Sequence, residues 1–303
     1  MEQGRHGRNK PAILVKGENV IPSISVVFIV LNEEKHLPSA LRSVEQWADE
    51  IVVVDMHSDD RTVEIAQQYG AKVFYHERIA AFDGARDYAV HCACGDWILM
   101  LDADELVPKC LSDELMKIAS CATAEIYLVP RANYFNGDLI RFAGWGAQQD
   151  QQMRFFKKNS LSLDATIHNF MHPRSGARLE SLPYEDGAAI QHFSYTDISQ
   201  FYEKLNRYTS VEAQQAHERG EKPCLFKAIT HSLREFVARY IKKQGFRDGW
   251  CGLHLSLLYM IYRWTVYAKL RELYATGGHQ KIIEKYQDVA NAIIAEYGKM
   301  RQP

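Results

Sequence analysis

Residues 97–105 read Trp-Ile-Leu-Met-Leu-Asp-Ala-Asp-Glu, an apolar run that ends in acidic residues. Five consecutive apolar residues are typical of a short strand that is buried on both faces of a parallel sheet. Side chains cease to alternate where a strand ends, so Asp102 and Asp104 can both turn toward one cleft. We therefore expect a buried strand that delivers two carboxylates to one edge of a sheet.

The chain before this run alternates strands with helices. Apolar, β-branched runs predict strands at 24–31, 51–54 and 72–75, and helical spacing of apolar residues predicts helices at 37–47, 62–69 and 84–93. This rhythm indicates βαβ units, and hence a parallel sheet with helices on both faces. Ligands of such sheets bind at the carboxyl ends of the strands, which is where Asp55 and Asp102 fall.

Length and composition fit one large folded domain, alone or with an appendage. The chain has 303 residues, of which 47% are hydrophobic and 24% charged, as in ordinary soluble proteins. The net charge of -2 argues against a nucleic-acid partner, because such proteins usually show a basic excess. The cysteines include no Cys-x-x-Cys pair, so we expect free thiols in a reducing, cytoplasmic setting. Residues 1–22 are expected to form a flexible tail.

Two common nucleotide-binding motifs are missing. The chain has neither Gly-x-Gly-x-x-Gly after its first strand nor a Gly-x-x-x-x-Gly-Lys-Ser/Thr loop, which argues against a dehydrogenase and a P-loop kinase. Carboxylates stand where glycines would let the backbone approach a diphosphate, and a carboxylate can hold a diphosphate only through a cation. Mg²⁺ and Mn²⁺ take oxygen ligands, so Asp102 and Asp104 are predicted to bind one of them. The alternative is that both acids solvate a loop and cap the next helix.

Two further residues lie where they could contact a nucleotide. Asp55 could accept a hydrogen bond from a uracil imide or a ribose hydroxyl. Arg86 could stack on the base or reach the phosphates. Each also has a plainer interpretation, Asp55 as an ordinary turn acid and Arg86 as a solvated helix residue.

Four blocks of the sequence resemble family-2 glycosyltransferases in their order and spacing. They are Ser25 to Glu34, Ile51 to Thr62, Gly84 to Ala89 and Gly95 to Glu105. Residues 150–156 resemble a family segment in which an acid is followed by an arginine on a strand, and residues 167–169 fall where a subset has Val-His-Glu. Residues 204–208 and 245–249 resemble the subset of that family that builds the inner core of bacterial lipopolysaccharide. The combined likeness covers nearly the whole chain after the tail.

The resemblance implies an α/β fold of the GT-A type over residues 23–200, a Rossmann-like, mostly parallel sheet flanked by helices. It also implies a nucleotide sugar, often UDP-linked, a Mg²⁺ or Mn²⁺ ion and inversion at the anomeric carbon. Carried over by position, the donor-binding residues are Asn32, Glu34, Asp55, Arg86 and Asp102. Asp102 would also lie near the metal, and Asp104 would ligate it.

Inversion needs a general base that takes the proton of the acceptor hydroxyl. Asp150 is the first candidate, because it is a carboxylate in a loop near Arg154. His168 is the second, since histidine exchanges protons near neutral pH, although it could instead be a structural histidine. Asn169 stands where the family usually has Glu, which removes one candidate base.

The acceptor is predicted to meet Trp145 and Arg154. Within Gly144-Trp145-Gly146, the indole could form an apolar platform for a sugar ring, whose C–H faces suit aromatic side chains. The alternative for Trp145 is plain core packing.

From about residue 201 the pattern is helical and basic. Residues 222–271 contain ten basic residues and two acids, a local charge of +8. Ile229, Leu233, Phe236, Val237, Tyr240 and Ile241 line one helical stripe, and an apolar run over 253–267 is shorter than the roughly 20 residues that cross a bilayer. We therefore predict that residues 201–303 form a helical region that lies on the anionic inner face of the cytoplasmic membrane. The alternative is a helical subdomain packed on the catalytic core.

The sequence thus predicts a metal-dependent, inverting glycosyltransferase that moves a sugar, such as glucose from UDP-glucose, onto a lipopolysaccharide-core or other surface-glycan acceptor. The acceptor could instead be a polyprenyl phosphate or a protein side chain. A second class of function is also open, a non-catalytic membrane assembly protein that binds a nucleotide sugar without turnover.

Overall fold

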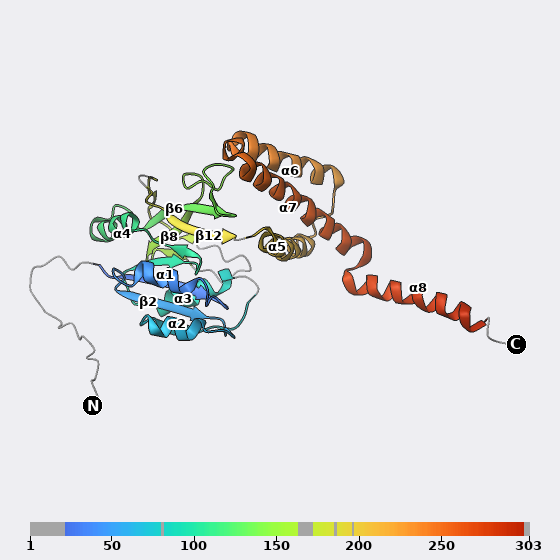
Figure 1. Cartoon of the computed structure of the whole chain (residues 1–303), viewed down its shortest axis with the longest axis horizontal. Coiled ribbons are helices and arrows are strands. Elements are labelled where there is room, and N and C mark those ends of the chain that lie inside the picture. The colour runs from blue at the N-terminus through green and yellow to red at the C-terminus, as the bar shows by residue number, and fades with distance from the viewer. Residues whose placement is uncertain (1–21, 80–81, 163–171, 185–186, 196, 300–303) are drawn as a thin grey trace, which may run out of the picture.

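A computed structural model describes residues 22–79, 82–162, 172–184, 187–195 and 197–299. Its centre is a mixed sheet with the strand order β3-β2-β1-β4-β8-β6-β12-β5, to which β7 and β11 add by pairing with β6 (Figure 1). The strands of this sheet are β1 (Ile24–Val30), β2 (Glu50–Asp55), β3 (Lys72–Tyr75), β4 (Trp97–Leu101), β5 (Glu105–Leu106), β6 (Ile126–Phe135), β7 (Asp138–Leu139), β8 (Gln151–Lys157), β11 (Leu179–Ser181) and β12 (Ile190–Tyr195). A separate small pair consists of β9 (Leu161–Ser162) and β10 (His172–Pro173).

The strands β3, β2, β1 and β4 run parallel, as the apolar runs predicted. In their register Val30 lies beside Asp55, and Phe28 lies beside Leu101. The loops that follow β1, β2 and β4 therefore leave the sheet at the same edge. This edge is the carboxyl end at which parallel sheets bind their ligands.

Helices cover both faces of the sheet and form two cores. The flanking helices are α1 (Leu37–Val44), α2 (Thr62–Gln68), α3 (Arg86–Cys92) and α4 (Lys109–Cys121). Side chains of α1, α2 and α4 share one core with inward residues of β1, β2 and β4, whereas α3 packs with the other faces of these strands. The predicted α/β fold of the GT-A type is confirmed.

The strand β8 runs against its two neighbours. β8 lies between β4 and β6 and is antiparallel to both. Its pairing sets Phe155 beside Leu99, so the next residue toward the carboxyl edge, Arg154, comes beside the acidic turn after β4. β12 follows parallel to β6, and the short β5 pairs with β12 so that His192 lies beside Glu105.

The chain after β12 is helical. It forms α5 (Ile198–Glu218), α6 (Leu225–Val237), the π-helical turn η2 (Ala238–Lys242), the 3-10 turn η3 (Gly245–Asp248), α7 (Gly249–Thr276) and α8 (His279–Lys299). α7 packs against both α5 and α6, and α8 extends away from the rest of the molecule (Figure 1). The helices meet the sheet at a cluster that includes Phe135, Phe201 and Leu255. In the described part of the chain, no helix has the length and apolar character to cross a membrane.

The element ends differ in detail from the prediction. The first strand ends at Val30, because Asn32 turns the chain with a φ of 57°. The helix predicted over 84–93 is a 3-10 turn, η1 (Phe82–Ala85), followed by α3. The expected division between a domain of 23–200 and a helical region of 201–303 stays a prediction, and the first helix after the sheet begins at Ile198. The predicted tail lies outside the described residues except for Pro22.

Candidate active site

The loop after β1 is tied to the turn after β2 by hydrogen bonds. The Asn32 N–H donates to Ser58 Oγ at 2.8 Å, and Asn32 Oδ1 accepts from the Asp59 N–H at 2.7 Å. Glu34 Oε2 accepts from the Arg61 N–H at 3.3 Å. Asn32 and Glu34 therefore shape the donor side of the edge, and direct contact with a donor stays a prediction for both. Asparagine suits this place because it tolerates positive φ better than most residues.

Asp55 ends β2 and is buried. Its Oδ1 accepts from Ser58 Oγ at 2.5 Å, and its Oδ2 accepts from the Ser58 N–H at 3.0 Å. A carboxylate has about four acceptor positions, so the turn occupies two of them. The predicted contact between Asp55 and a nucleotide requires one of the others.

Arg154 pairs with two carboxylates of the acidic turn after β4, and we call this pairing the Arg154 clamp. Its Nη2 donates to Asp102 Oδ2 at 2.6 Å and to Glu105 Oε1 at 3.0 Å. The guanidinium and Glu105 are buried, whereas the Asp102 side chain is 48% exposed. Arg131 Nη1 donates to the same Glu105 oxygen at 3.2 Å. The predicted acceptor contact of Arg154 stays a prediction, because this guanidinium faces Asp102 and Glu105.

The pKa values of Asp102 and Glu105 are shifted in opposite directions. Burial acts to raise the pKa of Asp102, but the charges of Arg154, Arg86 and His192 outweigh it and hold this pKa well below its usual range. Burial dominates at Glu105 and raises its pKa. Asp102 therefore keeps its negative charge over the whole working range, and Arg86 lies close enough to stabilise it.

A polar chain that the sequence did not predict runs from Asp150 to Asp104. Asn133 Nδ2 donates to Asp150 Oδ2 at 2.8 Å, and His192 Nδ1 lies 2.6 Å from Asn133 Oδ1. An amide oxygen only accepts, so His192 carries a proton on Nδ1. The other ring nitrogen, Nε2, lies 3.6 Å from Asp104 Oδ2. A proton on Nε2 as well would make this contact an ion pair between the imidazolium and the Asp104 carboxylate.

Asp150 is held on several sides. Its Oδ2 also accepts from Arg131 Nε at 2.9 Å, and its Oδ1 accepts from Gln152 Nε2 at 2.5 Å. Together with the bond from Asn133, three acceptor positions are used, whereas a general base must reach the acceptor hydroxyl with a remaining lone pair. The role of Asp150 as the base stays a prediction. His168, the second candidate base, lies outside the described residues.

Trp145 sits at the junction with the C-terminal helices. Its Nε1 donates to the Tyr259 hydroxyl of α7 at 3.0 Å, and its ring stacks on Tyr195 with centroids 5.9 Å apart. Phe135 meets the indole edge-on. These contacts favour the packing alternative for Trp145, and a sugar platform stays a prediction.

A lysine of α5 also faces the site. Lys204 Nζ lies 4.7 Å from the centroid of the Tyr195 ring. Burial acts to raise the pKa of Asp104, but His192 and, to a smaller extent, Lys204 lower it. Lys204 also acts to lower the pKa of Glu33, which burial raises. The sequence offered one hint of this role, because Lys204 begins a segment that resembles the lipopolysaccharide subset.

Carboxylates and cations are mixed in this cluster. Its carboxylates are Asp102, Asp104, Glu105 and Asp150, and the guanidiniums paired with them belong to Arg131 and Arg154. In the described residues, no three His, Cys, Asp or Glu side chains are placed to hold a metal by themselves. Mg²⁺ usually takes one or two carboxylates and completes its shell with substrate phosphates and water. Asp102 and Asp104 fit that mode of binding.

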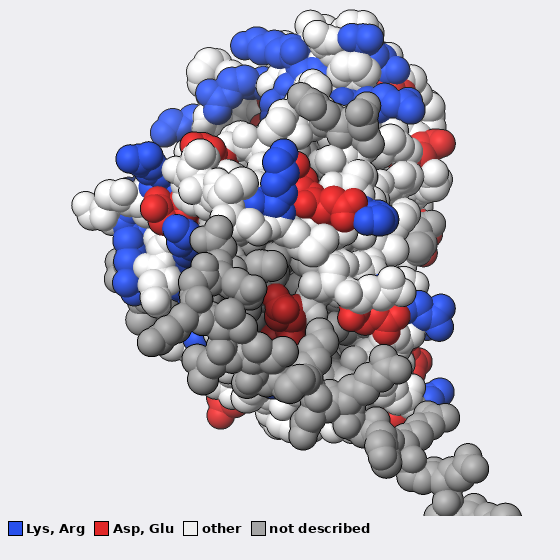
Figure 2. All heavy atoms as spheres, turned by 90° about the vertical axis from the view of Figure 1, so that its left-hand side faces the viewer, with Lys and Arg blue, Asp and Glu red and all other residues white. Residues whose placement is uncertain are grey.

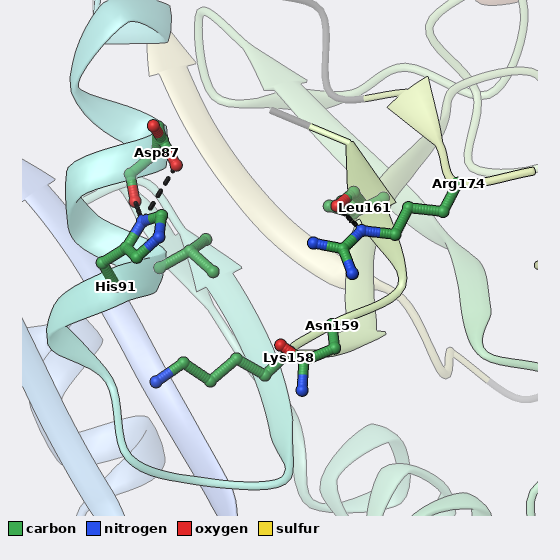
Figure 3. A pocket seen from close by; sticks show the side chains of 7 residues that line it. Asp87, His91, Lys158, Asn159, Leu161 and Arg174 are labelled. Atoms are coloured by element: carbon green, nitrogen blue, oxygen red, sulfur yellow. Dashed lines mark hydrogen bonds and ion pairs between the residues drawn. The ribbon is translucent and has the colours of Figure 1, made fainter. Parts of the chain in front are cut away.

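A cavity of about 350 Å³ lies apart from this cluster, between α3 and the turn after β8. Figure 3 shows Lys158 and Arg174 with their side chains along the cavity, facing His91 and Asp87 of α3. Arg174 Nε donates to the Leu161 carbonyl at 2.9 Å. None of the carboxylates of the Asp102 cluster lines it, so the predicted donor and metal residues do not gather there.

Comparison with known proteins gives consistent matches. The family model described as glycosyl transferase family 2 matches residues 25–183. An uncharacterized glycosyltransferase of Rickettsia felis is 30% identical over 82% of this chain and 89% of its own length. The lipopolysaccharide core biosynthesis glycosyltransferase LpsC of Rhizobium meliloti is 26% identical over 83% and 93%. Among solved structures, S. aureus TarS 1-349 in complex with UDP is 18% identical over 85% and 92%, with a TM-score of 0.44.

Proposed function

The chain belongs to glycosyl transferase family 2, and we propose that it moves a sugar, glucose from UDP-glucose in the first instance, onto a lipopolysaccharide-core or other surface-glycan acceptor with inversion. The observation that carries this proposal is the acidic turn at the carboxyl edge. There Arg154 holds Asp102 ionised and His192 faces Asp104. A charged, partly exposed carboxylate pair at the ligand edge suits a diphosphate donor that brings a cation.

The donor would lie along the edge formed by β1, β2 and β4. Asp55 has acceptor positions left for a uracil imide or a ribose hydroxyl. Arg86, at the start of α3, stabilises the charge of Asp102 and would meet the nucleotide. Hydrogen bonds of Asn32 and Glu34 connect the loop after β1 to the turn after β2 on this side.

Asp102 and Asp104 would hold Mg²⁺ or Mn²⁺ together with the donor phosphates. Such an ion, when bound, neutralises the negative charge that builds on the departing nucleoside diphosphate. Arg154 bonds to Asp102, and His192 Nε2 lies 3.6 Å from Asp104 Oδ2. Lys204 adds a positive charge on the side of α5.

In an inverting transfer the acceptor oxygen attacks the anomeric carbon while the diphosphate leaves from the opposite face. A base must take the hydroxyl proton at that moment. We keep Asp150 as the first candidate and His168 as the second. A variant of Asp150 also disturbs Arg131 and Asn133, so only an Asp150→Asn variant, which keeps the size of the side chain, can test the role.

The likeness to LpsC, named for lipopolysaccharide core biosynthesis, supports the proposed acceptor class. A lipid-linked acceptor of this kind would require the enzyme to work at the inner face of the cytoplasmic membrane, which we propose as its location. Polyprenyl phosphate and protein side chains are the competing acceptor classes, and an acceptor screen decides among the three.

Calorimetric titration tests the donor site. We expect UDP and UDP-glucose to bind only when Mn²⁺ or Mg²⁺ is present, and the Asp104→Asn variant to lose this binding. The matched control is Asp113→Asn, because Asp113 is an exposed α4 acid that pairs with Lys109. Binding that ignores both the metal and Asp104 would overturn the proposed mechanism.

Turnover is tested with labelled UDP-glucose and deacylated lipopolysaccharides of stepwise truncated core. We expect transfer to one truncated core, with an anomeric configuration opposite to that of the donor by NMR. Tight nucleotide binding without transfer or slow hydrolysis, over lipopolysaccharide, polyprenyl phosphate and peptide acceptors, would instead favour a non-catalytic assembly protein.

A further inference from the structure

The outer side of α6 carries an exposed apolar ladder. Its members recur every four residues and are each between 42% and 57% exposed, namely Leu225, Ile229, Leu233, Val237 and Ile241. Side chains four apart lie one above another on a helix, so these residues form a continuous stripe. Phe226 widens it at the start of the helix with a side chain that is 75% exposed.

The packing of α6 explains why this stripe is exposed. The helix meets α7, and the small side chains of Ala228 and Ser232 are its buried residues. Phe236 and Tyr240 stack on each other with centroids 5.3 Å apart and are only partly exposed. These two residues, which the sequence placed on the same stripe, therefore belong to the inner side, and Leu225 extends the exposed stripe by a turn.

Positive charge accompanies the ladder. Lys227, Arg234 and Lys242 belong to the same helix and the turn after it and are exposed, whereas Lys243 lies close to Gly144 and Arg247 lies over the Phe142 ring. Figure 2, which views the left-hand side of Figure 1, shows Lys and Arg side chains gathered at the upper end of the molecule. Glu235, one of the two acids of residues 222–271, pairs with Arg239 at 2.7 Å.

We propose that this face, the α6 ladder with its basic border, docks the enzyme onto an anionic lipid surface. Apolar side chains would enter the boundary of the acyl chains, and the basic side chains would meet the headgroups. Phe246 and the 72% exposed Trp250, at the tip between α6 and α7, supply aromatic rings of the kind that prefer the membrane interface.

The charge decides between a membrane and a second copy of the chain. Pairing two ladders would bring two positive borders together, and juxtaposed like charges oppose association. An anionic bilayer attracts the same border instead, by an interaction that salt weakens. We therefore commit to lipid as the occupant of this face.

Docking would also bring the active site close to the membrane surface. α7 lies between the ladder and the rest of the protein and is bonded to the site loop through Tyr259 and Trp145. The benefit of docking rests on the proposed function, because a lipid-linked acceptor would then be reached from the surface on which it is anchored. The binding itself involves none of the donor residues and needs neither metal nor nucleotide.

Sedimentation of the full chain with vesicles tests the proposal. We expect binding to vesicles of 70% phosphatidylcholine and 30% phosphatidylglycerol at low salt, and weak binding to pure phosphatidylcholine. The Ile229→Gln/Leu233→Gln variant should lose at least tenfold in partition coefficient. Lys227→Gln/Lys242→Gln should lose roughly fivefold per lysine on the anionic vesicles and become less sensitive to salt. The control Val211→Gln changes an exposed apolar residue of α5 and should bind like the parent.

Two readouts keep the result interpretable. Titration with UDP and Mn²⁺ should give the same affinity for the ladder variant and the parent, which shows that the variant is folded and separates a failure of docking from a failure of the donor site. Equal sedimentation of parent and ladder variant, or equal binding to neutral and anionic vesicles, would overturn the proposal. A dimer of the parent in lipid-free buffer that the ladder variant abolishes would also overturn it in favour of a second copy.

Discussion

The sheet and the helical hairpin formed by α6 and α7 place similar apolar side chains in opposite environments. In β4 all five residues are buried, because helices cover both faces of the sheet. In α6 the apolar ladder is half exposed, because the helix has α7 on one side only. Apolar character alone therefore does not reveal a core residue. What decides whether an apolar residue is buried is the number of layers that cover it. An uncovered apolar ladder is a surface that a lipid or another molecule can cover.

Charges show the same contrast. The sheet buries Arg154 and Glu105 against each other, whereas the helices carry their lysines and arginines on the outside. Breaking a buried pair leaves a charge without compensation, while exposed charges contribute little to folding. Substitutions in the two regions should thus have separable effects, on stability in the first and on docking in the second.

The largest effect is expected from Arg154→Met. This change leaves Asp102 and Glu105 without their main partner, and it should lower the free energy of unfolding by about 3–5 kcal/mol and abolish metal-dependent nucleotide binding. Chemical denaturation followed by tryptophan fluorescence measures the first effect. Arg61→Met, which breaks an exposed pair with Glu64, should change stability little. Equal stability of the two variants would show that the clamp is not a buried pair in solution.

Two tryptophans compare the regions directly. Trp145 packs at the junction and bonds Tyr259, so Trp145→Ala should lower the free energy of unfolding by about 3 kcal/mol. Trp250 is exposed at the tip of the hairpin, so Trp250→Ala should leave stability unchanged and weaken vesicle binding. The comparison fails if Trp250→Ala is the more destabilising of the two in lipid-free buffer.

Glu50 makes the stability of the sheet depend on pH. Burial acts to raise its pKa, but hydrogen bonds from the Cys94 N–H, Lys72 and Ser25 lower this pKa to about 2 from an ordinary 4.5. A lowered pKa stabilises the fold above pH 4.5, and this contribution is lost as the pH falls toward 2. Glu50→Gln should cost about 1–2 kcal/mol at pH 7, a discounted value because Lys72 is exposed to screening solvent.

The cost of Glu50→Gln should shrink steadily in denaturation curves recorded from pH 4.5 down to pH 2.5. Glu64→Gln, at an exposed pair on α2, is the matched control and should show a much weaker pH dependence. A penalty for Glu50→Gln that stays constant down to pH 2.5 would contradict the assigned direction of the pKa shift.

The smallest effect concerns Lys204, the lysine of α5 that faces the site. Lys204→Met should raise the KM for UDP-glucose by roughly tenfold, about 1.4 kcal/mol, because a positive charge near Asp104 and Glu33 is lost. Lys204→Arg should recover most of this affinity. Lys222→Met, an exposed residue before α6, should leave KM unchanged in the same steady-state assay. A purely structural Lys204 would give equal KM values for the Met and Arg variants.

The parallel half of the sheet could be predicted because its signals are local. The runs around Val27, Val53 and Leu99 are apolar on both faces, and the helices between them are amphipathic. Asp55 and Asp102 followed from the same pattern, because a strand end fixes the place of the next residue. These predictions needed no knowledge of which strands pair over long distances.

The rest of the site depends on such distant pairing. His192 reaches Asp104 only because β12 pairs with the two-residue strand β5, and nothing in the sequence around residues 105–106 marks a strand. Arg154 meets Asp102 and Glu105 because β8 is inserted antiparallel beside β4. The sequence showed that Arg154 and His192 are polar, but not which neighbours they would meet.

The pairing of Glu105 with His192 has a consequence for biosynthesis. A ribosome adds roughly 5–20 residues per second, so β12 emerges about 4–17 s after β5 has been made. During that interval β1, β2 and β4 can already join. Because β12 has not been made, Asp104 lacks the His192 imidazole, and Glu105 can pair only with Arg131 and Arg154. The nascent chain can thus bury its first core well before the polar chain from Asp150 to Asp104 is complete.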